Sequence, residues 1–316
     1  MRVLFLGSGA FGLPTLEALM ADHTVVGVVS QPARPAGRKR KATPTPVAAY
    51  AETMAVPLRC TPDANMDDTA AWADALKPEA TVVVAFGQKL QSNLLARLGP
   101  FVVNLHASLL PRYRGAAPIN WALLRGETET GVSVISIAER MDAGLVYARR
   151  RTPIQSDETA GQLHDRLAVL GPEAIAEVLA AAAVGKLVGE VQDEAHVTRA
   201  PKLSKADGNV TFDATPAAVR CRIHGLTPWP AARVTWERRD LGTAMTLTLH
   251  RVVECDSPIG EAAPGTVLDG HRIAVRGGAV RLLEVQAPGK RPMAIDAFVR
   301  GTPMSPGDRL VGEEKR

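Results

Sequence analysis

The sequence is poor in cysteine and aromatic residues, and it contains no long apolar run. Of its 316 residues, 3 are cysteine and 4% are Phe, Trp or Tyr. Cys60, Cys221 and Cys255 are odd in number and have no C-x-x-C spacing, so they indicate neither a disulfide framework nor a zinc site. No apolar stretch approaches the ~20 residues of a membrane helix. We therefore expect a protein of the reducing cytoplasm, without a membrane partner or a bound metal.

Acidic residues are absent from residues 31–46, QPARPAGRKRKATPTP, although this segment is rich in basic ones. Its basic residues are Arg34, Arg38, Lys39, Arg40 and Lys41. The prolines exclude a helix, and an isolated run of charge is more often a solvated loop. This run, however, follows a predicted strand at the edge of a sheet where ligands bind. We therefore interpret it as a loop that binds phosphates.

Basic charge is also concentrated toward the C-terminus. The net charge of the chain is +4. Residues 199–316 hold 18 Lys and Arg against 13 Asp and Glu, whereas the preceding residues hold 19 against 20. This balance permits a polyanionic partner without requiring one. Four further residues extend the basic track: Lys202, Lys205, Lys290 and Arg291.

Short apolar runs alternate with helical patterns in the first part of the chain. The strand-like runs are residues 3–6, 24–30, 81–86 and 101–105, and the helical patterns include residues 13–20 and 90–98. This alternation predicts an α/β fold with a mostly parallel, open, Rossmann-like sheet and helices on both faces. The next elements are predicted as a helix at 119–125, strands at 132–137 and 145–154, and one helix over 159–184. We place this domain at residues 1–190.

The pattern changes after residue 190. Residues 191–206 lose periodicity and are interpreted as a linker. Residues 246–253, 273–276 and 280–285 are strand-like, and Gly277-Gly278 between the last two is a hairpin signal. We therefore predict a small OB-like β-barrel over residues 207–316.

A glycine pattern near the N-terminus resembles a dinucleotide-binding fingerprint. Gly7, Gly9 and Gly12 match G-x-G-x-x-G between a strand and a helix. The fingerprint also needs a carboxylate about 20 residues further on, at the end of the second strand. That strand ends with Ser30-Gln31, so we favour a simple tight turn. Arg34 beside this strand keeps NADP binding open as an alternative.

Two polar side chains end an apolar strand in the middle of the first domain. Asn104 and His106 follow the run at 101–103, and alternation along a strand directs both toward one face. Asp142 follows the next strand along the chain and supplies a carboxylate. If an amine attacks a carbonyl here, Asn104 and a protonated His106 can donate to the oxyanion while Asp142 orients the imidazole. No nucleophile elbow accompanies them, so we expect direct transfer, with the general base left open.

These residues lie in a segment that resembles the hallmark region of folate-dependent formyltransferases. The segment runs from Asn104 to Gly144 as NLHASLLPRYRGAAPINWALLRGETETGVSVISIAERMDAG. The catalytic Asn, His and Asp of that family fall on Asn104, His106 and Asp142. The motifs PAGR at 35–38, KLSK at 202–205 and HGLTPWP at 224–230 are similar to the branch of the family that formylates methionyl-tRNA.

The resemblance implies substrates and further site residues. The formyl donor would be 10-formyltetrahydrofolate, and the acceptor would be the amino group of initiator methionyl-tRNA. Residues implied in folate binding are Phe86, Gly87, Gln88, Leu90, Ser108, Leu109, Leu110 and Pro111. Residues implied in tRNA binding are Arg34, Arg38, Lys39, Arg40, Lys41, Lys202 and Lys205.

Three other functions stay open at this level. APINWALLRGETETGV, at residues 117–132, also resembles amino-sugar formyltransferases, which makes an amino sugar the alternative acceptor. A non-catalytic RNA-binding module built on the barrel would not need His106. An NADP-dependent dehydrogenase would use the glycine-rich turn and Arg34.

Overall fold

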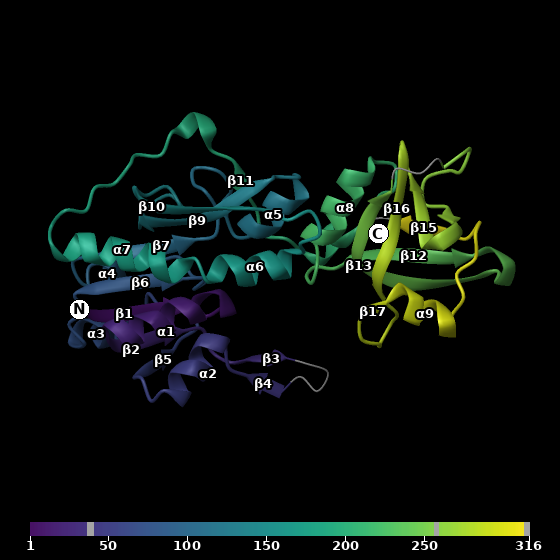
Figure 1. The fold of residues 1–316 in the computed structure, drawn as a ribbon. Helices are drawn as coiled ribbons and strands as arrows, with labels where there is room; N and C mark the ends of the chain where they lie inside the picture. Colours follow the sequence, from purple (N-terminus) through teal and green to yellow (C-terminus); the bar gives the residue numbers. More distant parts are fainter. Residues whose placement is uncertain (37–40, 256–258, 313–316) are drawn as a thin grey trace. The chain divides into compact units, whose positions relative to one another are not determined.

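The computed structural model describes residues 1–36, 41–255 and 259–312. The chain divides into two compact units, which are coloured along the sequence in Figure 1. The first unit consists of Met1–Ala116, Thr130–Thr152 and His164–Ala200. The second consists of Ala117–Glu129, Pro153–Leu163 and Pro201–Arg316.

The first unit is built on one seven-stranded sheet with the order β10-β9-β7-β6-β1-β2-β5. Its strands are β1 (Arg2–Gly7), β2 (Thr24–Ser30), β5 (Leu58–Cys60), β6 (Ala80–Val84), β7 (Val102–His106), β9 (Glu129–Ser136) and β10 (Val146–Pro153). Strands β7, β6, β1, β2 and β5 pair in parallel with their neighbours, and β9 pairs antiparallel with β7. The predicted mostly parallel, Rossmann-like sheet is confirmed.

Helices cover both faces of this sheet. They are α1 (Leu13–Asp22), α2 (Pro46–Thr53), α3 (Asp67–Ala75), α4 (Ser92–Leu95) and α7 (Gly171–Ala183). Helix α6 (Ala160–Ala168) begins in the second unit and ends in the first. Helices α3 and α4 share an apolar cluster with Leu4 and Leu6 of β1. On the opposite face, Gly171 of α7 lies against Leu105 of β7 and Thr15 of α1.

The single helix predicted over 159–184 is wrong, because the structure has α6 and α7 in its place. Pro172 lies in the first turn of α7. A proline cannot donate to the preceding turn and disfavours a helical residue before it, so the helix is interrupted there. The apolar periodicity on both sides continues across the break, which explains the prediction.

The basic segment after β2 contains a short hairpin. Strands β3 (Arg34–Ala36) and β4 (Lys41–Thr43) pair antiparallel, with Arg34 opposite Thr43. Arg34 and Lys41 are exposed. The predicted tRNA-binding residues Arg38, Lys39 and Arg40 lie outside the described residues.

The second unit is a curved antiparallel sheet with the order β14-β15-β16-β13-β12-β18. Its elements are α5 (Pro118–Leu124), α8 (Pro216–Gly225), β12 (Ala232–Arg238), β13 (Thr243–Cys255), β14 (Val267–Leu268), β15 (Arg272–Val275), β16 (Gly278–Gln286), β17 (Met293–Ala294), α9 (Ile295–Gly301) and β18 (Arg309–Gly312). A bridge between Thr266 and Arg309 joins the two ends of this order. That closure confirms the predicted OB-like barrel.

The barrel closes over a buried aromatic and a buried carboxylate. The Trp236 side chain is fully buried, and its Nε1 donates to Asp308 Oδ2 at 3.0 Å. Asp308 also accepts from the amides of Arg239 at 2.9 Å and Ser305 at 3.0 Å. A buried carboxylate with three donors is stabilised rather than left desolvated.

The segment between the two units is packed at both ends. Gln192 is buried in the first unit, and Leu203 is buried in the core of the second. Within the first unit, β11 (Arg199–Ala200) pairs with β8 (Arg114–Gly115). The domain limits at 190 and 207 and the linker of 191–206 remain predictions. Within the described residues, no helix is both long and apolar enough to cross a membrane.

His224 fills a polar gap in the barrel wall. The pairing of β13 with β16 shifts register around Arg251, and such a bulge leaves a backbone amide without its ladder partner. The amide of Val252 donates to Nε2 of His224 at 3.2 Å, so the ring proton is on Nδ1. Burial, with a smaller contribution from the positive charges of Arg220 and Arg251, lowers the pKa of His224 to about 4. His224 is therefore neutral in the folded protein near neutral pH.

This neutral histidine predicts a loss of stability in acid. Because the folded pKa lies below the ordinary value, the unfolded chain binds a proton first, and stability falls as the pH drops from about 6.5 toward about 4. The loss should reach about 2–3 kcal/mol by pH 4.5. Urea unfolding of the second unit, followed by tryptophan fluorescence, should show it.

In His224→Gln the glutamine oxygen can still accept from Val252, but the side chain does not titrate. The difference in free energy of unfolding between pH 7 and pH 4.5 should therefore be about 2–3 kcal/mol smaller than in the wild type. Equal differences for the two proteins would contradict the role assigned to His224.

Candidate active site

Strand β7 presents two polar side chains at its carboxyl end, between β6 and β9. Asn104 is half-buried, and His106 is only 6% exposed. Leu105 between them points to the other face of the sheet, where it lies against Gly171. The alternation of the strand therefore puts Asn104 and His106 on one face. This is the arrangement expected for ligand binding at the carboxyl edge of an open α/β sheet.

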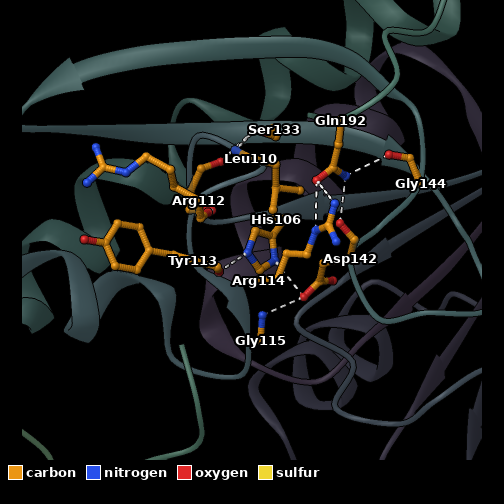
Figure 2. A network of polar contacts seen from close by, with 11 residues as sticks. His106, Leu110, Arg112, Tyr113, Arg114, Gly115, Ser133, Asp142, Gly144 and Gln192 are labelled. Atoms are coloured by element: carbon orange, nitrogen blue, oxygen red, sulfur yellow. Dashed lines mark hydrogen bonds and ion pairs between the residues drawn. The ribbon is translucent and has the colours of Figure 1, made fainter. Parts of the chain in front are cut away.

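The imidazole of His106 is held by a backbone carbonyl. Its Nε2 lies 2.9 Å from the carbonyl oxygen of Tyr113. A carbonyl only accepts, so Nε2 carries the proton in this bond. Nδ1 lies 3.7 Å from Oδ2 of Asp142, which is longer than a hydrogen bond but close enough for an ion pair once the ring is protonated. Figure 2 shows the ring between the Tyr113 carbonyl and the Asp142 carboxylate.

Asp142 is positioned by a backbone amide from the loop after β7. The N–H of Gly115 donates to Oδ2 of Asp142 at 2.8 Å. Gly115 has a φ of 129°, and a Cβ at this position would lie 2.5 Å from the carbonyl oxygen of Ala200. Only glycine allows this close approach of the two chains. The glycine thus brings its amide to the carboxylate.

Gln192 supports the loop that carries Asp142, and the sequence analysis missed it. Its Nε2 donates to the carbonyl oxygens of Asp142 at 2.8 Å and Gly144 at 2.7 Å. Its Oε1 accepts from Nε of Arg114 at 3.0 Å and from Nη2 at 2.8 Å. These bonds are drawn in Figure 2. Gln192 lies in an aperiodic segment without a motif, so no local signal marks it.

Left-handed backbone conformations of residues other than glycine gather around this edge. Ala85 follows β6 with a φ of 46°, Tyr113 has a φ of 63°, and Asp142 has a φ of 56°. Each such residue costs roughly 1–3 kcal/mol and persists only where its surroundings impose it. The clustering of three of them favours a functional site here.

The first predicted folate-binding segment mixes core residues with exposed backbone. Phe86 and Leu90 are buried in the core. The Gln88 amide accepts from the N–H of Ala64 at 2.7 Å and donates to the carbonyl of Thr61 at 3.1 Å, so it ties down a neighbouring loop. Gly87 is exposed, with a φ of 77°. It offers main chain and no side chain to a ligand.

The second predicted folate-binding segment closes on itself. The Ser108 hydroxyl donates to the carbonyl of Arg112 at 2.6 Å, and Leu110 is buried in the core. Leu109 and Pro111 are half-buried and supply apolar surface. Which residues of the two segments contact folate remains a prediction.

The predicted tRNA-binding residues that the structure describes belong to different units. Arg34 and Lys41 lie on the hairpin of the first unit, where Arg34 also donates to the side chain of Gln31. Lys202 and Lys205 are exposed in the second unit. Their role in tRNA binding remains a prediction.

The glycine-rich turn serves packing. A Cβ on Gly7 would lie 2.4 Å from the ring of Phe5, and one on Gly12 would lie 3.1 Å from it. The N–H of Gly9 donates to the carbonyl of Ala85, and the N–H of Gly12 donates to the carbonyl of Gly9. A pyrophosphate site needs such amides unpaired. These glycines therefore form a tight turn between β1 and α1, and the NADP-binding interpretation is not supported.

The described residues contain no group of three or more His, Cys, Asp and Glu side chains arranged to hold a metal ion.

Comparison with known proteins gives matches over nearly the whole chain. The profile of the formyl transferase family matches residues 1–179, and the profile of the formyl transferase C-terminal domain matches residues 202–303. The chain is 38% identical over 315 residues to a methionyl-tRNA formyltransferase of Geotalea uraniireducens (strain Rf4), covering 98% of both. It is 40% identical over 309 residues to a methionyl-tRNA formyltransferase of Cereibacter sphaeroides (strain ATCC 17029 / ATH 2.4.9), covering 98% of this chain and 99% of that protein.

Solved structures of lower identity share the fold. The N-formyltransferase from Helicobacter canadensis, in complex with folinic acid and dTDP-3-aminofucose, has a TM-score of 0.67 at 14% identity. The similarity covers 91% of this chain and 98% of that one. HypX from Aquifex aeolicus, in complex with tetrahydrofolic acid, has a TM-score of 0.63 at 18% identity, over 95% of this chain and 47% of that one. At this low sequence identity, the structural similarity supports the fold alone.

Substituting the glycine two residues after Asp142 should destabilise the first unit. A Cβ on Gly144 would lie 1.9 Å from the carbonyl oxygen of Ser136, so Gly144→Ala must push the loop away from β9. We expect the free energy of unfolding in urea to fall by about 1–3 kcal/mol. The control is Gly301→Ala, where a Cβ meets nothing within 4 Å. Its stability should stay within about 0.5 kcal/mol of the wild type. Equal effects of the two variants would contradict the packing argument.

Proposed function

This chain belongs to the formyl transferase family, and we propose that it transfers a formyl group from 10-formyltetrahydrofolate to the amino group of initiator methionyl-tRNA. The observation that carries this proposal is the 37–40% identity to methionyl-tRNA formyltransferases over about 98% of the chain. The product would serve translation initiation, and we place the enzyme in the cytoplasm.

The amino-sugar alternative has weaker support. A solved structure that represents it, the N-formyltransferase from Helicobacter canadensis, is 14% identical to this chain and shares only the fold. The relatives named for methionyl-tRNA match both units of the chain. The second unit, with its exposed Lys202 and Lys205, suits a polyanionic acceptor.

The proposed reaction is a direct transfer. The acceptor nitrogen forms a bond to the formyl carbon, and the bond from that carbon to N10 of the folate breaks. The amine loses one proton and N10 gains one, so atoms and charge balance. Ser108 is the serine nearest to His106 in sequence, and its hydroxyl is already bonded to the Arg112 carbonyl. The geometry therefore favours attack by the substrate amine itself over a covalent enzyme intermediate.

Asn104 and His106 would stabilise the oxyanion that develops on the formyl oxygen. Nε2 of His106 is bonded to Tyr113, which leaves Nδ1 as the ring donor to the substrate. Each such donor is commonly worth ~3–4 kcal/mol in the transition state. Asp142, at 3.7 Å, would stabilise the positive charge of the protonated ring without taking up its hydrogen bond.

The surface beside this pair suits a flat donor molecule. Ala85 and Gly87 are exposed and carry little or no side chain, so a planar heterocycle could approach their main chain. The half-buried Leu109 and Pro111 would contribute apolar surface. A site of this kind, apolar with a few fixed polar groups, is typical for cosubstrates.

The acceptor can be tested directly. Labelled formyl from 10-formyltetrahydrofolate should appear on charged initiator tRNA and not on an amino-sugar nucleotide offered in parallel. Asp142→Asn should lower kcat at least about 100-fold with KM for tRNA within about twofold, because the charge acts in the transition state. Asp165→Asn, on the exposed surface of α6, is the matched control and should act like the wild type. Label on the sugar alone would overturn the proposal.

Charge reversal on the hairpin tests the tRNA-binding role. Arg34→Glu with Lys41→Glu should raise KM for tRNA at least about tenfold and weaken its dependence on salt, because phosphate contacts are lost. Hydrolysis of the formyl donor without tRNA should not change. Lys77→Glu with Lys186→Glu makes the same change in net charge at two other exposed positions and should leave KM within about twofold. An equal rise in KM for both double variants would contradict a specific role of the hairpin.

A further inference from the structure

The segment after α7 holds the Asp142 loop through the side-chain amide of Gln192. The two N–H groups of Gln192 donate to two carbonyls, of Asp142 and Gly144, and its oxygen accepts twice from Arg114. A side-chain amide has two donors and one oxygen with two lone pairs, so every hydrogen-bonding position is occupied. The residue is 5% exposed, so water does not compete for these bonds.

The same segment holds the loop that fixes His106. Oγ1 of Thr198 accepts from the amide of Tyr113 at 2.8 Å. The carbonyl of Thr198 accepts from the amide of Arg114 at 2.9 Å, and the β8–β11 pairing continues the contact through Gly115 and Ala200. Tyr113 supplies the carbonyl that accepts from His106, and Gly115 supplies the amide that donates to Asp142. The residues that contact His106 and Asp142 are therefore themselves held by this segment.

We propose that residues 192–200 form a positioning strap that sets the distance between His106 and Asp142, with Gln192 and Thr198 as its positioning residues. The inference rests on the proposed function, in which the Asp142 carboxylate stabilises the positive charge that His106 carries in the transition state. Neither residue touches a substrate. Misplacing a reacting group by about 1 Å can cost about 100-fold in rate, so a positioning residue has a kinetic signature of its own.

Glu194 lies on the same strap but is not a positioning residue. Its carboxylate pairs with Arg114 and Arg140, both at 3.0 Å, and its side chain is 54% exposed. Exposed ion pairs contribute little because water screens them. Glu194→Gln is therefore a control on the same segment, and its kcat should stay within about twofold of the wild type.

Gln192→Glu is the isosteric test. It retains an oxygen for Arg114 and replaces the donor of two hydrogen bonds by an oxygen that faces two carbonyls. We expect kcat for tRNA formylation to fall about 10- to 100-fold, with KM for tRNA and for the folate within about twofold. Thr198→Val, which loses the acceptor for Tyr113, should lower kcat about 3- to 10-fold. A wild-type kcat in a folded Gln192→Glu protein would overturn the proposal.

A double variant separates positioning from general damage. In an Asp142→Asn background there is no carboxylate charge to position, so adding Gln192→Glu should lower kcat less than about threefold further. A full multiplication of the two effects would overturn the proposal. If Gln192→Glu does not fold, as judged by its urea unfolding, Gln192→Asn takes its place. The shorter amide should give a smaller loss of the same kind, and a wild-type kcat for it would likewise overturn the proposal.

Hydrolysis of 10-formyltetrahydrofolate without tRNA distinguishes this inference from the proposed acceptor. Gln192→Glu should slow hydrolysis by the same factor as transfer, whatever the natural acceptor is. If Gln192→Glu slowed transfer but left hydrolysis unchanged, the positioning role of residues 192–200 would be contradicted. If the wild-type protein transferred formyl to the sugar alone, only the proposed function would be contradicted.

Discussion

A buried histidine beside a carboxylate needs partners that hold both groups without neutralising either, and this requirement shapes the carboxyl edge of the first unit. One short stretch of chain, residues 113–115, supplies both partners: a carbonyl for His106 and an amide for Asp142. Because both groups are largely buried, their interaction is screened less than it would be in water. The surrounding loops hold residues 113–115 in the position from which both partners reach His106 and Asp142.

Holding residues 113–115 in this position costs conformational energy, which the packing of the sheet offsets. Tyr113 and Asp142 both hold left-handed backbone, and Gly115 permits a contact with Ala200 that a side chain would block. The central strands beneath are largely buried, and Tyr113, Gly115 and Asp142 lie in the loops after β7 and β9. A rigid scaffold with strained loops at one edge is a general way to hold reactive groups in a fixed geometry.

Several features were predictable because local physics decides them. The apolar runs and their alternation with helices predicted the open sheet, and the hairpin signal at Gly277-Gly278 fits the observed turn between β15 and β16. Strand alternation put Asn104 and His106 on one face. The family resemblance is confirmed by the full-length relatives. The break between α6 and α7 was missed because apolar periodicity outweighed the proline signal at Pro172.

The sequence by itself determined the main strands of the sheet, the family and the residue types of the candidate site, since these depend on short-range patterns. Only the tertiary structure decided how those residues are used. The side chains of Gln88 and Ser108 form hydrogen bonds that close loops, and Nε2 of His106 donates to the carbonyl of Tyr113. Gln192 joins the site from 50 residues beyond Asp142. Hydrogen bonds between distant segments follow no sequence period, so no local pattern could reveal them.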